Sequence, residues 1–433
     1  MTKVALLTPQ GPTLGTAVNS TGLVRSLLLT AVFLLLWISL RPFADLSAAP
    51  EVTDAGTLAN QVGYSLLFLL LAAWCLAHDP SRLVALVRPL LVVTLLWFSL
   101  SVVASWEPSV SARRLAFTLV TLGIAGMALL LPKNVRHFSA VMAAAALIVL
   151  AACYLGVFLL PARAIHQATD FIDPDLVGDW RGVFAHKNEA SAAMVVFIFI
   201  GLFVARVRSA RIGMLIVALA APFLFFTQSR TSIAMLPMTL IVSTLLARIR
   251  SPALGITLAL SVVAIFNVVS VGSIYLEPVR NLLDAVLTDA SFTGRTDIWQ
   301  FALAHVAERP ITGYGFATFW GTPEVVYGMA GGSVWANTAA HAHNAYLNLA
   351  LTIGIPGAAL ATLWLVWLPL VDFYRSSPAP SASPLKMLFL RVVLFIAYGS
   401  CFESMLLETS ALGLWMYMAT FALRLLSVSR VAP

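Results

Sequence analysis

The stretch FSAVMAAAALIVLAACYLGVFLL, residues 138–160, carries no charge and is long enough for one helical crossing of a bilayer. Similar apolar runs recur along the chain, which is 60% hydrophobic and 10% charged, with a mean hydropathy of +0.92. A soluble protein of 433 residues needs more polar surface than this composition supplies. Barrel strands would be about half as long and would alternate in polarity. The sequence therefore predicts an all-α, polytopic membrane protein.

The number of apolar runs sets the expected number of membrane spans. The run at 343–370 is longer than one perpendicular crossing requires, so we expect it to tilt. Residues 23–40 are followed by Arg41-Pro42 and not by a small-residue cleavage site, which indicates an uncleaved first span. We predict about twelve spans, near 23–40, 62–78, 89–106, 115–131, 138–160, 189–205, 211–227, 231–247, 253–272, 343–370, 387–403 and 406–427.

The loop charges predict the orientation of these spans. With the N-terminus and C-terminus in the cytoplasm, most of the 26 Lys and Arg residues fall on the cytoplasmic side, where such residues concentrate. Of the 19 acids, only Asp79 and Asp372 share that side. We expect one integral membrane domain over 1–433. Two large loops, 161–188 and 273–342, would lie in the periplasm, the second with short helices.

Composition also excludes several classes of partner and cofactor. The net charge of +7 is explained by topology, and there is no basic-aromatic array typical of nucleic-acid binding. Cys75, Cys153 and Cys401 lie in or beside apolar runs without ligand-like spacing, which argues against a disulfide framework or a zinc site. We therefore expect membrane lipids as surroundings, no nucleic acid, and no metal or other cofactor.

Ten basic residues remain on the outer side, and most of them have simple explanations. Arg41, Arg113 and Arg114 sit at span ends, where long cationic side chains reach the interface. The loop residues Arg163, Arg280 and Arg309 are expected on the solvated surface. The remaining outer cations lie in motifs that suggest chemistry.

The first of these motifs is DWRGVFAHKNEAS, residues 179–191, just before the sixth predicted span. Arg181 and Lys187, with His186 and Asn188 beside them, would place cations at a helix N-terminus, which favours an anion. The alternative is simple charge balance, against the acidic residues Asp170, Asp173, Asp175 and Asp179.

Two further arginines occupy unusual places. Arg230 lies in TQSRTS (227–232), a connection so short that the guanidinium sits at the membrane surface and needs an anionic partner, from the protein or a ligand. Arg295 lies in SFTGRTDIWQFALAHVAERP (291–310), where the pattern predicts a helix over 296–308 capped by Thr293 or Thr296. A cation is unfavourable at a helix N-terminus, so Arg295 is expected to bind an anion.

The last motif is HAHNAYLNLALTIGIPG, residues 341–357, where an outer loop re-enters the membrane. Imidazole is suited to taking a proton near neutral pH, so His343 or His341 is a candidate general base. A capping or core histidine and a metal ligand are the alternatives, and no third ligand is obvious. The preceding stretch ITGYGFATFW (311–320) is expected to shape a sugar-facing or membrane-facing loop.

Taken together, these stretches resemble the O-antigen ligase/polymerase superfamily, which includes exopolysaccharide polymerases and protein O-oligosaccharyltransferases. His343-Asn344, nine residues, then Gly354-Ile355-Pro356-Gly357 is similar to the His-Asn and Gly-x-x-Gly motif of O-antigen ligases. The resemblance covers about the last 250 residues, through RGVFAHKN (181–188), QSRTS (228–232), TGRTDIW (293–299) and RPITGYGFATFW (309–320).

The resemblance implies a GT-C-like, metal-independent, inverting glycosyltransferase in a bacterial inner membrane, with a periplasmic active site. Its donor would be an undecaprenyl-diphosphate-linked glycan, and we prefer lipid A-core as the acceptor. His343, Arg181 and Arg295 would be catalytic. Substrate would also contact Arg230, Lys187, His186, Asn188, Asn344 and His341. A polymerase is the first alternative and a protein O-oligosaccharyltransferase the second. A lipid-linked sugar transporter is a different class, disfavoured because no charges are clearly buried at mid-span.

Overall fold

Each of the twelve predicted spans overlaps a helix of the computed structural model, which describes residues 20–38, 42–47, 55–171, 173–286, 292, 294–328, 331, 333–376 and 384–428. No strand occurs in these ranges. The α-helices are α1 (Ser20–Trp37), α2 (Ala55–His78), α3 (Pro80–Leu86), α4 (Pro89–Val103), α5 (Pro108–Ala128), α6 (Val135–Leu159), α7 (Pro161–Ala164), α8 (Lys187–Val207), α9 (Ala210–Phe226), α10 (Arg230–Arg248), α11 (Pro252–Val269), α12 (Glu277–Val286), α13 (Arg295–Glu308), α14 (Pro323–Val326), α15 (Val334–Thr338), α16 (Ala345–Thr362), α17 (Leu368–Arg375), α18 (Pro384–Gly399) and α19 (Ala411–Val428).

Helix length limits how many of these elements can cross a membrane alone. In the described chain, eight helices are long and apolar enough, and the bent pair α3–α4, with 72° between its halves, makes nine if it is one span. The apolar parts of α1 and α9 are shorter, and α18 has 16 residues. The polytopic helical class is confirmed. The number twelve exceeds what helix length and hydropathy support and stays a prediction.

Local sequence explains where the helices begin. Pro80, Pro89, Pro108 and Pro252 occupy the first turns of α3, α4, α5 and α11, where a missing N–H costs nothing. Side chains of Asn134, Ser209 and Ser251 accept backbone N–H groups at the starts of α6, α9 and α11. These caps separate consecutive helices that hydropathy alone would merge.

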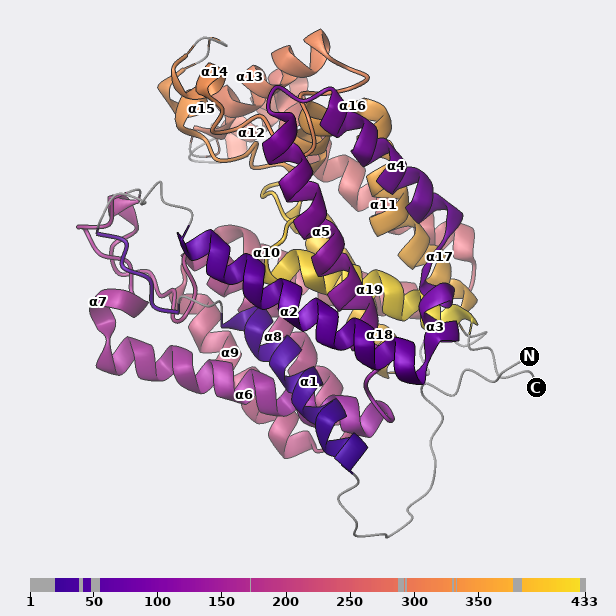
Figure 1. Cartoon of the computed structure of the whole chain (residues 1–433). Coiled ribbons are helices and arrows are strands. Elements are labelled where there is room, and N and C mark those ends of the chain that lie inside the picture. The colour runs from indigo at the N-terminus through magenta and orange to yellow at the C-terminus, as the bar shows by residue number, and fades with distance from the viewer. Residues whose placement is uncertain are drawn as a thin grey trace.

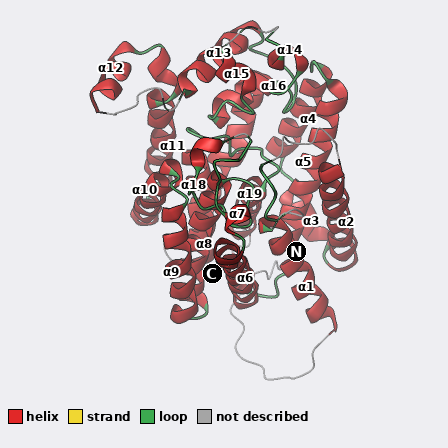
Figure 2. Cartoon of the chain, turned by 90° about the vertical axis from the view of Figure 1, so that its left-hand side faces the viewer, coloured by secondary structure: helices red, strands yellow, loops and turns green. Residues whose placement is uncertain are grey.

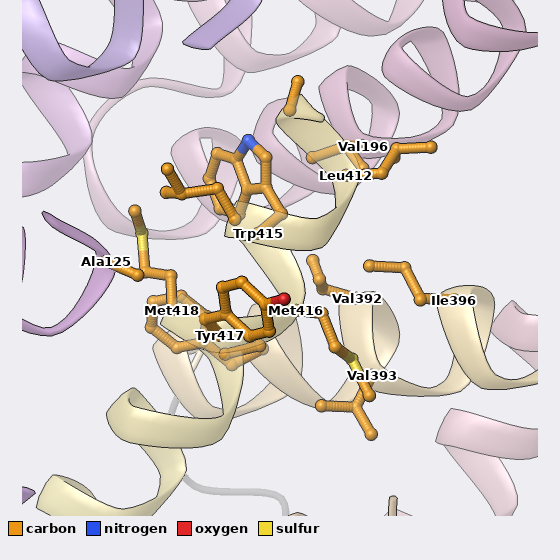
Figure 3. Close-up of a cluster of buried hydrophobic side chains, with 14 of the residues drawn as sticks. Ala125, Val196, Val392, Val393, Ile396, Leu412, Trp415, Met416, Tyr417 and Met418 are labelled. Carbon is orange, nitrogen blue, oxygen red and sulfur yellow. The ribbon is translucent and has the colours of Figure 1, made fainter. Parts of the chain in front are cut away.

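The core of the bundle lies around α8, α18 and α19, which bury most of their residues. Figure 3 shows side chains of α19 in one cluster with those of neighbouring helices, with Leu412 next to Val196 of α8 and Met416 next to Val392 of α18. In contrast, α11 and α2 leave most of their residues partly or fully exposed, as expected for helices that face lipid.

The connections predicted to lie outside the membrane gather at one end of the bundle. The Trp106 N–H donates to the Tyr314 carbonyl, the Trp180 N–H to the Phe226 carbonyl, and the Ala345 N–H to the Ser400 carbonyl. Helices α13 to α15, from the 273–342 segment, lie together over this end (Figure 1), and α12 projects to one side of them (Figure 2). Loops distant in sequence therefore share one site-forming face.

The structure corrects one boundary that matters for the site. The predicted spans 387–403 and 406–427 are separated by almost nothing, whereas α18 ends at Gly399 and α19 begins at Ala411. Residues 400–410 form a loop whose Met405 and Leu406 are buried. Their apolar side chains made this loop look like membrane helix, because hydropathy does not distinguish burial in protein from burial in lipid.

Candidate functional site

Three side chains from distant parts of the chain meet at the loop-covered end. The Glu403 carboxylate, in the loop between α18 and α19, lies 2.6 Å from Arg295 Nη2 at the start of α13. Its second oxygen lies 3.1 Å from Nδ1 of His343, just before α16. The Asn188 side-chain amide, in the first turn of α8, also donates to Glu403 at 3.4 Å. The structure thus brings three of the predicted site residues, His343, Arg295 and Asn188, to one carboxylate.

The charges of this cluster keep the Glu403 carboxylate ionised. Burial alone would raise the pKa of Glu403, but Arg295 and the hydrogen bond from His343 hold it at about 2. An ionised carboxylate only accepts hydrogen bonds, so Nδ1 of His343 carries the donated proton. In a neutral ring with its proton on Nδ1, the other nitrogen, Nε2, has the lone pair needed to accept a proton, as in hydrolytic His-carboxylate pairs. The geometry supports His343 as a base oriented by Glu403.

His343 is held in a strained backbone conformation. Its φ is +48°, a left-handed value that costs a non-glycine residue energy and that clusters at functional sites. Its N–H donates to Nδ1 of His341 at 3.3 Å, and the two rings lie 4.3 Å apart. Burial lowers the pKa of His341 to about 4, with His343 adding to the effect, so His341 is neutral near pH 7. Among the described residues, His343 pairs with the carboxylate of Glu403, and no ion pair to His341 is found.

Asn344 positions His343 from inside the protein. It is fully buried and caps α16, accepting the Leu347 N–H at 2.9 Å. Its amide donates to Asn267 at 2.9 Å and to the Cys401 carbonyl at 3.0 Å. The predicted contact of Asn344 with substrate is not supported by this burial, because its polar atoms are already paired within the protein.

The glycines after His343 have a packing explanation. Gly354 interrupts α16 with φ +73° and ψ 167°, and a Cβ there would lie 1.9 Å from the Ile311 carbonyl oxygen. This close approach lets the Gly315 N–H donate to the Thr352 carbonyl at 2.8 Å. At Gly357, a Cβ would lie 2.7 Å from the Trp97 ring of α4. The motif therefore docks the 309–320 segment and α4 against the helix that begins next to His343.

The sequence places Arg295, a cation, at a helix N-terminus, where an anionic partner is expected. The structure supplies that anion from the protein itself, as the Glu403 carboxylate. Arg295 is the first residue of α13, and its guanidinium donates to Glu403 and to the Phe402 carbonyl at 2.6 Å. The predicted Thr296 cap is wrong, because Gly294, with φ +79°, is the N-cap and Thr296 lies inside the helix. Thr293 lies outside the described residues.

The other predicted cations of the 161–188 segment are engaged locally. Arg181 is buried and donates to the carbonyls of Phe184 at 3.0 Å and Ala44 at 2.7 Å. Lys187 pairs with Asp179 at 2.6 Å. His186 caps α8 and lies 3.5 Å from Asp173, whose pKa its hydrogen bond lowers. Lys187 and His186 therefore balance the charges of acidic residues in the same loop.

Arg230 remains available to a ligand among the described residues. It is exposed at the first position of α10, and no ion pair to it is found in the described part of the chain. Ser232, two residues later, lies 2.7 Å from Ser191 of α8. The start of α10 therefore lies alongside α8, whose Asn188 reaches Glu403.

A cavity of about 660 Å³ adjoins this cluster through His341. Its walls come from α2, α5, α16, the 316–320 segment and the 406–409 segment. It is lined by Arg113 and Arg114, predicted from sequence as interfacial anchors, and by Glu408. Burial raises the pKa of Glu408 to about 7, although Arg114 opposes the shift.

Sequence reasoning missed Glu403 and Glu408, although a signal existed. They are the only acids after Asp372, and both lie in CFESMLLETS (401–410) between two apolar runs. An acid at such a position needs a cationic partner. Among the described residues, no three His, Cys, Asp or Glu side chains come together as metal ligands.

Comparison with known families adds an independent finding. Residues 193–362 match the family model described as O-antigen ligase. The matched segment contains Arg230, Arg295 and His343, whereas Glu403 and the two cavity arginines lie outside it. No curated protein matches the chain. The match confirms the resemblance to the O-antigen ligase/polymerase superfamily drawn from the motifs.

Proposed function

We propose that the chain, whose residues 193–362 match the family model described as O-antigen ligase, transfers a glycan from undecaprenyl diphosphate to lipid A-core. The reaction would take place on the periplasmic face of a bacterial inner membrane. The observation that carries this proposal is the His343–Glu403–Arg295 cluster beside a cavity large enough for a small-molecule group.

The proposed reaction is one displacement at the anomeric carbon. The acceptor hydroxyl oxygen bonds to that carbon while the bond to the diphosphate oxygen breaks and its electron pair leaves with undecaprenyl diphosphate. The hydroxyl proton passes to Nε2 of His343, and the anomeric configuration inverts. Two carboxylates placed for a double displacement are not needed in this scheme.

The charged groups around His343 have separate roles in this proposal. Glu403 fixes the ring and stabilises the imidazolium that forms when the proton arrives. Arg295 keeps Glu403 ionised and fixes the loop through the Phe402 carbonyl. Arg230, exposed at the start of α10, is the cation we assign to the leaving diphosphate, with the α10 N-terminus beside it. Arg181, buried among carbonyls, would act by holding the 42–47 and 181–184 segments together.

A polymerase that extends lipid-linked glycan uses the same chemistry with another acceptor, and TGRTDIW (293–299) also resembles exopolysaccharide polymerases. The test is a competition in detergent with purified protein, lipid-linked glycan and lipid A-core. We expect glycan on lipid A-core and released undecaprenyl diphosphate. Longer lipid-linked chains instead would identify a polymerase. Intact donor with every acceptor, a peptide included, would contradict a transferase.

A further inference from the structure

The cavity beside His341 has a strongly polar wall that the reaction scheme does not yet use. Arg113 and Arg114 lie near the start of α5 and line it together with Asn60 and Gln61 of α2. Its volume of about 660 Å³ falls within the range of roughly 300–1,000 Å³ usual for small-molecule sites. Two adjacent cations in such a cavity favour an anionic group.

The position of Arg114 is fixed by the loop opposite. Its guanidinium donates to the carbonyl of Ala317, a residue with φ +53° in the cavity wall. A guanidinium has five N–H donors, so one such bond orients the group and leaves it able to bind a planar or tetrahedral anion. Arg114 is therefore better oriented to bind an anion than a surface cation without such a hydrogen bond.

The loop 400–410 links this wall to the catalytic cluster. Glu403 holds His343, and Glu408, five residues later, lines the cavity. The Glu408 carbonyl packs so closely on α19 that a Cβ at Gly413 would lie 1.8 Å from it. One rigid loop therefore sets the base and the cavity wall relative to each other.

Two sides of the cluster can be distinguished. Through His341, whose ring lies 4.3 Å from that of His343, the cluster adjoins the cavity with α2 and α5. Through Asn188, it adjoins α8 and the start of α10 with Arg230. Figure 2 shows α2 and α5 on one side of the bundle and α9 and α10 on the other, with loops between them.

We propose that the cavity is the acceptor subsite, and that Arg113 and Arg114 bind an anionic group, phosphate or carboxylate, next to the acceptor hydroxyl that reacts. This inference rests on the proposed function, and it places the donor diphosphate on the Arg230 side of the cluster. The enzyme would then select its acceptor by charge as well as by shape.

The test compares wild-type protein with Arg113→Gln, Arg114→Gln and the double variant. Arg280→Gln, on the exposed face of α12, is the matched control. Two charge-assisted bonds to the anionic group are lost in the double variant, so we expect its acceptor KM to rise about tenfold or more. The donor KM should stay within about twofold, and Arg114→Lys should recover part of the acceptor affinity.

Modified acceptors identify the anion. One preparation of lipid A-core is treated with phosphatase, and another has its carboxylates reduced to alcohols. The preparation that lacks the recognised group should bind wild-type protein as weakly as the native acceptor binds the double variant. A rise in the donor KM, or an unchanged acceptor KM, would overturn the subsite.

A direct binding measurement tests the acceptor subsite independently of the proposed transfer reaction. Fluorescent lipid A-core in detergent, without donor, should bind wild-type protein and lose affinity in the double variant. If wild-type protein binds it in this arginine-dependent way but transfers nothing, the proposed reaction fails and the subsite stands. Binding that does not depend on Arg113 and Arg114, or no binding at all, would refute the subsite whatever the transfer assay shows.

Discussion

At the scale of single residues, Glu403 connects the features that the sequence presents separately. It pairs with Arg295 at 2.6 Å and with His343 at 3.1 Å. The motifs around His343 and Arg295 could be read from the sequence because histidine and arginine are conspicuous there. Glu403 stands out in the sequence as an acid between two apolar runs, but no local pattern indicates that it pairs with residues more than 50 positions away.

Replacing the carboxylate tests this connection. In Glu403→Gln, His343 loses the charge that stabilises its imidazolium, so we expect kcat for glycan transfer to fall about 100-fold or more, with donor and acceptor KM within about twofold. Glu277→Gln, an exposed acid on α12, should have no effect. An equal loss of kcat and affinity, or unchanged turnover, would argue against a role through His343.

The same residue predicts an acid-dependent loss of stability. The pKa of Glu403 is lowered from its usual 4.5 to about 2, so its stabilising contribution is present above pH 4.5 and is lost as the pH falls towards 2. We expect the unfolding temperature of wild-type protein in detergent to fall between pH 4.5 and 3 more steeply than that of Glu403→Gln. Parallel curves for the two proteins would mean that Glu403 is not held ionised.

The motif around Arg181 predicted a catalytic role, whereas the contacts of its side chain indicate a structural one. Its guanidinium bonds the carbonyls of Ala44 and Phe184 within a buried site. Arg181→Ala removes both bonds and should lower the free energy of unfolding by about 2–4 kcal/mol, seen as a reduced unfolding temperature. The exposed Arg163 provides the control, Arg163→Ala. Full stability with lost transfer would instead restore the predicted catalytic role.

At the scale of elements, most helices could be predicted and their junctions could not. Hydropathy located α6, α8 and α10 because their apolar runs are long and end in charged or capping residues. The loop 400–410 was missed because its apolar side chains are buried in protein. Arg113 and Arg114 were assigned to the interface because the sequence does not show that α2, α16 and α5 enclose a cavity.

The break in α16 is an element with a direct structural test. Gly354 has a left-handed φ and no room for a Cβ against the Ile311 carbonyl, so Gly354→Ala should cost several kcal/mol, about 3 or more, or prevent folding. At Gly272 the nearest atom to an added Cβ lies at 3.5 Å, so Gly272→Ala should be tolerated. Normal yield and unfolding temperature for Gly354→Ala would contradict the packing described for the Gly-x-x-Gly motif.

At the scale of the whole molecule, the account requires one orientation in the membrane. The three native cysteines are buried, so introduced cysteines can be labelled against a low background. Tyr327→Cys, at an exposed position of the 273–342 segment, should react with an impermeant maleimide added to spheroplasts. Ala210→Cys, at the exposed first residue of α9, should react only after permeabilisation. The reverse pattern would place the site in the cytoplasm.

The central claim is that His343, held by Glu403, accepts the proton of an acceptor hydroxyl during glycan transfer. The most direct measurement is the transfer rate from undecaprenyl-diphosphate-linked glycan to lipid A-core by wild-type protein and by His343→Asn. Asparagine tolerates the left-handed backbone but is no base, so folding is retained. The account predicts transfer with release of undecaprenyl diphosphate by wild-type protein, and a rate lower by about 100-fold or more in the variant. Equal rates for the two proteins would contradict it.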